Sequence, residues 1–154
     1  MTTYTTNISP VIYARFAGIL YLTIIVFGIS SEVFIRSGLI VTGDADATAS
    51  NILASQSLFR TGFVLDSIML LADVAIAIIF YVLLKPVNNI LSLIAAAFRL
   101  MQAAILGFNL LNYYAALLLL NGTGYLAAFE GKRLNSLAMF FLDMHSHGYD
   151  LGLI

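Results

Sequence analysis

The sequence predicts an all-α fold: a polytopic membrane helical bundle with about four transmembrane helices and one short interfacial helix. Three observations support this fold class. Of the 154 residues, 61% are hydrophobic and only 10% are charged, and the mean hydropathy is +0.98. Long apolar runs recur along the chain, separated by short polar or charged segments. A chain of this composition cannot bury its apolar surface against itself in water, so a soluble globular protein is excluded.

Composition also removes several function classes. The net charge of -1 provides no basic field for nucleic acid, and no nucleic-acid partner is expected. The absence of cysteine excludes disulfides, thiolate metal ligands and thiol nucleophiles. A metal would therefore need histidines and carboxylates, and the chain has only two histidines. We expect no cofactor.

The first transmembrane helix is expected over residues 13–35. Its first basic residue already lies at the mouth of the apolar run, whereas a secretory signal carries a basic segment earlier, so we expect a retained helix. Ala14 and Gly18 form a small-residue pair suited to close helix packing. Near the far end, Glu32 is interpreted as an interfacial carboxylate in reach of water and of Arg36.

A short interfacial helix is expected over residues 45–57. Asp44 or Asp46 is placed to cap its first turn. The segment has too few apolar residues to span a membrane, which favours an amphipathic connector lying on the membrane surface. The alternative is a lid over the polar residues described next.

The second and third transmembrane helices, over residues 58–84 and 90–120, form the hairpin around which the chain is organised. Each exceeds the roughly 20 apolar residues that cross a bilayer. Between them, Pro86 cannot donate a backbone hydrogen bond and stops the first helix, and Asn88 can cap the next one. So short a turn forces the two helices to be antiparallel and adjacent.

Polar residues inside this hairpin form an intramembrane polar seam, which we define as Asp66, Asp73, Arg99, Gln102 and Asn109. Spacings of three, four and seven place them on one face of each helix. In an antiparallel hairpin, residues at equal distances from the turn lie at the same depth in the membrane. This places Asp73 at the depth of Arg99 and Gln102, and Asp66 near Asn109. Because an unpaired charge at the bilayer centre is costly, an Asp73–Arg99 ion pair is predicted. The seam is either structural glue or the lining of a functional site.

The fourth transmembrane helix, over residues 134–154, carries Asp143, His145, His147 and Asp150. Helical spacing places three of them on one face and turns His145 about 160° away. They cannot converge on one ion along a regular helix, and we expect no metal. Hydrogen-bonding histidines at the water boundary are the simplest interpretation, and a proton relay or ligand site is the alternative.

The expected partner is the lipid bilayer. Gly148 and Gly152 form a GxxxG pair, which favours tight packing against another helix. Small-residue faces of this kind also allow a homo-oligomer or a membrane partner. We expect residues 1–154 to form one integral membrane domain, with an incomplete last helix, in the cell membrane. Basic residues are divided almost evenly between the two sides.

Four blocks of the sequence are distinctive: GDADATASNILAS over residues 43–55, LFR over 58–60, YVLLKPVN over 81–88 and AAAFRL over 95–100. In order and spacing, from about residue 14 to the end, the chain resembles a bacterial family of multi-pass membrane proteins, domain of unknown function 4386 (DUF4386). The resemblance implies fold and location, and no activity. It also implies that the chain ends early, because that family continues through further membrane helices.

Three function classes follow from these observations. The first is a structural or partner-binding membrane protein, which needs only small-residue helix faces. The second is a small-solute or proton pathway, which needs a wet seam. The third is a membrane-embedded metal-dependent hydrolase, which needs Asp143, His145 and His147 to converge with another carboxylate. We expect the first, and a protein that is not an enzyme.

Overall fold

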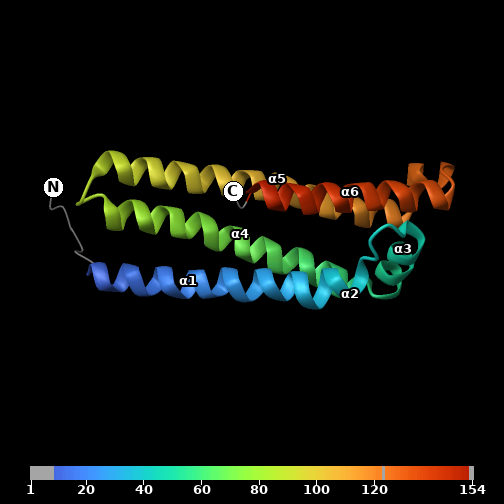
Figure 1. The fold of residues 1–154 in the computed structure, drawn as a ribbon, viewed down its shortest axis with the longest axis horizontal. Helices are drawn as coiled ribbons and strands as arrows, with labels where there is room; N and C mark the ends of the chain where they lie inside the picture. Colours follow the sequence, from blue (N-terminus) through green and yellow to red (C-terminus); the bar gives the residue numbers. More distant parts are fainter. Residues whose placement is uncertain (1–8, 123, 153–154) are drawn as a thin grey trace.

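The structure, a computed structural model that describes residues 9–122 and 124–152, is an elongated bundle of helices (Figure 1). In chain order the elements are α1 (Pro10–Ser30), the π-helical turn η1 (Ser31–Arg36), α2 (Ser37–Leu39), α3 (Ala45–Ala54), α4 (Gln56–Leu84), α5 (Asn89–Asn121), the 3-10 helix η2 (Gly124–Ala128) and α6 (Gly131–Gly152). No strand occurs within those described ranges, which confirms the all-α fold class.

Three helices are long and apolar enough to cross a membrane: Pro10–Leu39, Gln56–Leu84 and Asn89–Asn121. They correspond to the first three predicted helices. Large apolar side chains remain on the outside of the bundle, where Leu71 is 69% exposed and Phe108 is 74% exposed. Contact with water would make such exposure unfavourable, whereas contact with hydrocarbon does not. These helices identify the chain as a membrane protein.

The first span extends further than predicted. The sequence pattern ends it at residue 35, before the charge of Arg36, but the helix continues through η1 and α2 to Leu39. Arg36 does not end the helix, because its side chain is buried, at 7% exposed, and its charge is paired with carboxylates. The π-helical turn, which holds one more residue than an α-helical turn, lies at this point.

Helices α4 and α5 form the predicted antiparallel hairpin (Figure 1). The side chain of Asn88 caps α5 by accepting hydrogen bonds from the backbone N–H groups of Ile90 and Leu91, at 3.0 and 3.1 Å. Helix α4 also contacts the first span, so it is the central helix of the three spans. Polar side chains of the first span and of α5 can therefore both reach α4.

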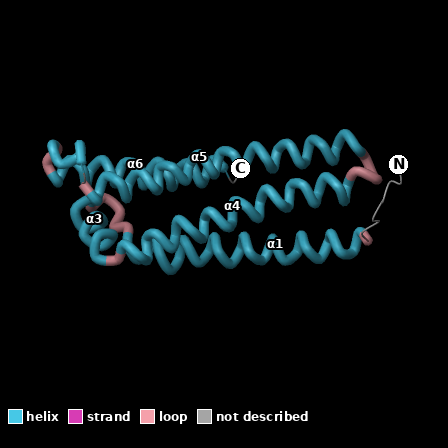
Figure 2. Tube along the Cα trace, turned by 180° about the vertical axis from the view of Figure 1, so that it is seen from behind, coloured by secondary structure: helices cyan, strands magenta, loops and turns pink. Residues whose placement is uncertain are grey.

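Helix α3 lies at one end of the bundle, beside the end of the first span and the start of α6 (Figure 2). Asp44 caps it by accepting a hydrogen bond from Ala47 N at 2.9 Å, as one of the two predicted alternatives. Asn135 of α6 holds α3 in place by donating to Asp46 at 2.8 Å. The helix ends at Ala54, earlier than the predicted residue 57, because α4 already begins at Gln56.

A hydrophobic core lies at the same end of the bundle, between the end of the first span, α3, α4, α5 and α6. Its largest fully buried side chains are Tyr113 and Phe59. Their rings stack with centroids 4.1 Å apart, and the Tyr113 hydroxyl donates to the Phe59 backbone carbonyl at 2.9 Å. Gly62 makes this approach possible, because a Cβ there would lie 2.7 Å from the Tyr113 hydroxyl oxygen.

Helix α6 runs along α5 and ends about halfway along the bundle (Figure 2). Its GxxxG pair packs closely, as predicted: side chains at Gly148 and Gly152 would collide with Asn109 and Leu106. The helix forms where the fourth membrane helix was expected, with residues 153–154 outside the described ranges. It carries several charged residues, however, and is not one of the three candidate spans.

Among the described residues, no helix packs closely against the small residues in the first half of the first span, since nothing lies within 4 Å of a Cβ placed on Gly18. Packing of this face against another chain stays a prediction. The first span instead approaches α4 at Gly28, where a Cβ would lie 3.2 Å from the sulfur of Met69. Spacing alone identifies small residues, but the rotation of the helix about its axis decides which of them face a neighbour.

Candidate functional site

The polar seam is built around α4, which carries two buried carboxylates. Asp66 is 3% exposed and Asp73 is 4% exposed. Their spacing of seven residues, close to two helical turns, places both on one face of α4. Each accepts from an arginine of a different helix, so α4 is tied to the helix on either side of it.

Arg99 of α5 forms the predicted ion pair with Asp73, with Nη2 and Oδ1 2.5 Å apart. Arg99 also donates from Nη1 to the Tyr21 hydroxyl at 2.9 Å, and its guanidinium lies over the Tyr21 ring at 4.9 Å from the centroid. Tyr21 belongs to α1. One guanidinium group therefore joins all three membrane spans.

Arg36 forms a second buried ion pair, which links the first span to α4. Its Nη1 lies 2.6 Å from Asp66 Oδ2 and 3.0 Å from Ser31 Oγ, and its Nε donates to Glu32 at 2.6 Å. In a π-helix, residues five apart lie over one another, which brings Ser31 next to Arg36. The widened turn thus directs this guanidinium inward while Glu32 remains near the surface, 65% exposed.

The predicted neighbour of Asp66, Asn109, is not its partner. Asp66 bonds to Arg36, and Asn109 instead donates from Nδ2 to the backbone carbonyl of His145 at 2.7 Å. His145 lies between the two, with Nδ1 at 3.2 Å from the Asn109 carbonyl oxygen and Nε2 at 4.0 Å from Asp66 Oδ2. The depth estimate was correct, but it did not include the intervening side chain from α6.

The seam opens into a groove of about 880 Å³ between the first span and α6. We call it the α1–α6 groove. Residues of α4 and α5 form its floor, where Met69, Asp73, Arg99, Gln102 and Leu106 lie. The first span contributes one wall and α6 the other. The walls include Ile25, Ile29, Glu32 and Arg36 of the first span and Met139, Leu142, Asp143, His145, Ser146, His147, Tyr149 and Asp150 of α6.

The polar stripe of α6 on this groove consists of Asp143, His147 and Asp150, all exposed. Its depth follows from the glycine contacts, since Gly148 lies against Asn109 and Gly152 against Leu106. Asn109 is 12 residues before the end of α5, which corresponds to about 18 Å along the helix axis. The stripe therefore runs from Asp150, alongside the middle of a membrane span, to Asp143, about 10 Å nearer the α3 end, on the groove side of α6.

Three buried polar atoms at the site have no hydrogen-bond partner among the described residues: Asp66 Oδ1, Arg99 Nε and His145 Nε2. Tyr149 crosses from α6 to donate to the sulfur of Met69 at 3.1 Å, and its ring lies under Arg36.

The two histidines do not form a metal site with their neighbours. His145 points into the bundle and is 3% exposed, whereas His147 lies on the open side of α6. In the part of the chain that the structure describes, no group of three or more His, Cys, Asp or Glu residues could hold a metal ion. The convergence that a metal-dependent hydrolase would require is not found among these residues.

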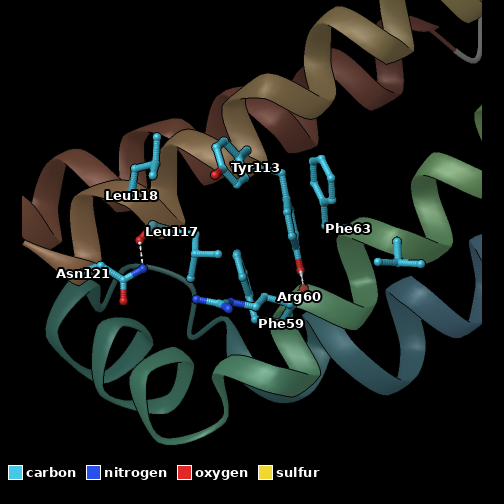
Figure 3. Close-up of a pocket in the computed structure, with 9 residues that line it drawn as sticks. Phe59, Arg60, Phe63, Tyr113, Leu117, Leu118 and Asn121 are labelled. Carbon is cyan, nitrogen blue, oxygen red and sulfur yellow. Dashed lines mark hydrogen bonds between the residues drawn. The ribbon is translucent and has the colours of Figure 1, made fainter. Parts of the chain in front are cut away.

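A second pocket, of about 350 Å³, lies between α4 and α5 at the α3 end (Figure 3). It is lined mainly by apolar and aromatic side chains, including Phe59, Phe63 and Leu118. Two of its polar side chains are used within the fold, because the Tyr113 hydroxyl and Asn121 Nδ2 donate to backbone carbonyls at 2.9 Å, and Arg60 is its one charged lining residue. The α1–α6 groove is therefore the stronger candidate site.

Arg36, Tyr21 and Tyr149 take part in the site and were not predicted there; Arg36 was expected only as a neighbour of Glu32, which it contacts at 2.6 Å. One signal was present: the interior of the hairpin carries Asp66 and Asp73 but only Arg99 as a cation, since Arg60 and Lys85 lie near its ends. A second buried carboxylate requires another cation, and Arg36 is the nearest arginine outside the hairpin on the same end as Asp66. The two tyrosines carry no comparable signal.

The comparisons with known proteins identify a family and nothing further. The family model described as domain of unknown function (DUF4386) matches residues 16–154, so the chain belongs to this family, as the resemblance predicted. Neither the curated proteins nor the solved structures contain a match to the chain.

Proposed function

We propose that this member of the DUF4386 family binds a small polar or charged solute within the cell membrane. The solute would enter the α1–α6 groove from the end of the bundle that carries α3. Ile40 and Thr42 line the groove at that end, and Asp73 and Arg99 line it near the middle of the spans. The groove would thus connect one side of the membrane with the middle of the spans, which is half of a transport pathway.

The observation that carries this proposal is the polar stripe of α6. Asp150 is exposed near the depth of the α5 centre, where a charged side chain facing hydrocarbon costs about 2.5–3.5 kcal/mol on insertion scales, and Asp143 is exposed about two turns nearer the α3 end. Charged residues at membrane depth generally face a water-filled cavity or the interior of a bundle. A wet groove satisfies this requirement, and about 880 Å³ is within the range of small-molecule sites.

The two buried ion pairs support the proposal as structural elements. They hold the first span and α5 against α4, which fixes the floor and one wall of the groove. The structural role expected from the sequence is therefore compatible with solute binding. A partner-binding role would require a groove without water, because a partner helix in the groove would exclude water from the polar stripe of α6.

Cysteine accessibility tests the proposal directly, because the natural chain contains no cysteine. Single cysteines would be placed in the groove, by Ser146→Cys on α6 and Gln102→Cys on α5, and at Phe108→Cys as the control. Phe108 has a depth similar to that of Gly148 but faces outward. A membrane-impermeant thiol reagent should label both groove cysteines in intact membranes and leave the control unlabelled. Binding is then measured as saturable slowing of Ser146→Cys labelling by a panel of small amines, carboxylates and zwitterions.

Two results would overturn the proposal. If neither groove cysteine reacts in membranes or after purification, the groove is closed to water. If both react only after purification, a partner polypeptide covers the groove in the membrane, and the partner-binding role replaces solute binding.

A further inference from the structure

We infer that the solute is a linear organic cation with two or more ammonium groups, an inference that rests on the proposed function. Four carboxylates and two guanidinium groups line the groove, which leaves two negative charges in excess. The carboxylates are Glu32, Asp73, Asp143 and Asp150. Cationic solutes are therefore attracted to the groove, and anionic ones are repelled.

The excess charge is concentrated on α6. Arg99 is paired with Asp73, and Arg36 is shared between Glu32 and Asp66. Asp143 and Asp150 have no ion-pair partner within residues 9–122 and 124–152. The arginines are thus occupied by the fold, and the charges left for a ligand are the two carboxylates of α6.

A buried acceptor beside the groove independently indicates a donor ligand. A backbone carbonyl can only accept, so His145 Nδ1, at 3.2 Å from the Asn109 oxygen, must carry the hydrogen. His145 lines the groove, and its Nε2 is then an acceptor without a partner among the described residues. The carboxylate oxygen 4.0 Å from Nε2, Asp66 Oδ2, can only accept and already does so from Arg36, so the donor for Nε2 would come from the groove. An ammonium group has three N–H donors and no acceptor.

The spacing of these acceptors favours a chain-like cation over a bare ion. Asp143 and Asp150 are seven residues apart, which is about 10 Å along α6, so one ion cannot bind both. The groove also has apolar lining, from Ile25 and Ile29 on the first span and from Met139 and Leu142 on α6. A methylene chain can pack against these apolar side chains while its ammonium ends reach the carboxylates.

Calorimetric titration of the full chain in lipid nanodiscs tests the inference. The probes are 1,6-diaminohexane, hexylamine and adipate, which share a six-carbon chain and differ in charge. We expect saturable binding of the diamine, affinity for hexylamine about tenfold weaker because one ion pair is lost, and no binding of adipate. Asp143→Asn and Asp150→Asn should each weaken diamine binding about tenfold, and Asp143→Glu should retain it.

Glu130→Gln is the matched control, because Glu130 is an exposed carboxylate outside the groove that pairs with Arg133 at 3.4 Å. Gel filtration and circular dichroism of each variant verify that it is folded. The inference fails if folded Asp143→Asn and Asp150→Asn bind the diamine as the natural chain does, or if adipate binds as well as the diamine. If the groove cysteines are labelled and an anion or zwitterion slows their labelling, the proposed function stands and only the ligand class is wrong. If the groove cysteines are not labelled, both are wrong.

Discussion

Arg36 Nη1 and Asp66 Oδ2 lie 2.6 Å apart, on the first span and α4, with side chains only 7% and 3% exposed. Burying both charges costs more than their attraction returns unless further hydrogen bonds satisfy them. Ser31 and Glu32 provide those bonds for Arg36, whereas one oxygen of Asp66 remains without a partner among the described residues. The pair therefore closes the first span onto α4 while leaving an acceptor beside His145.

Removal of one member of this pair should destabilise the fold more than removal of both. Arg36→Met leaves Asp66 buried and unpaired, and the free energy of unfolding should fall by about 3–5 kcal/mol. The double variant Arg36→Met, Asp66→Leu should recover most of that loss. Unfolding by SDS in mixed micelles measures both, and Arg133→Gln, at an exposed pair, should have no measurable effect. Equal losses in the single and double variants would show that the ion pair itself stabilises the fold.

The contact between α5 and α6 depends on the absence of a side chain at Gly148. Gly148→Ala places a methyl group against the Asn109 amide, which should break the Asn109–His145 hydrogen bond and lower the midpoint of thermal unfolding. Gly18→Ala is the matched control, because Gly18 is also in a helix and has open space around it. Its midpoint should stay the same or rise, since alanine is the better helix former. Similar midpoints for the two variants would contradict this packing.

The Tyr113 hydroxyl should contribute to stability through a single buried hydrogen bond. Tyr113→Phe keeps the stacked ring and leaves the Phe59 carbonyl without this donor, so the free energy of unfolding should fall by about 1–2 kcal/mol. Tyr114→Phe, one residue along and 45% exposed, is the control. The SDS unfolding assay compares them, and a loss at Tyr114 as large as at Tyr113 would be evidence against the specific bond.

Local patterns in the sequence were sufficient for the fold class, the three spans and part of the site. The length of each apolar run and the turn at Pro86 make α4 and α5 antiparallel. In such a hairpin, the number of residues between a side chain and the turn gives its depth in either helix. This depth alone predicted the Asp73–Arg99 pair. The GxxxG pair of α6 likewise predicted close packing, although not its partner.

Only the tertiary structure decided which groups meet across the groove. The partner of Asp66 depends on the rotation of the first span about its axis, which the π-helical turn sets by adding a residue before Arg36. The position of His145 depends on the side of the hairpin along which α6 lies. Neither quantity is encoded in the periodicity of one helix, because both result from packing between segments that are far apart in the chain. The helices were therefore readable from the sequence, and the groove that their polar faces enclose was not.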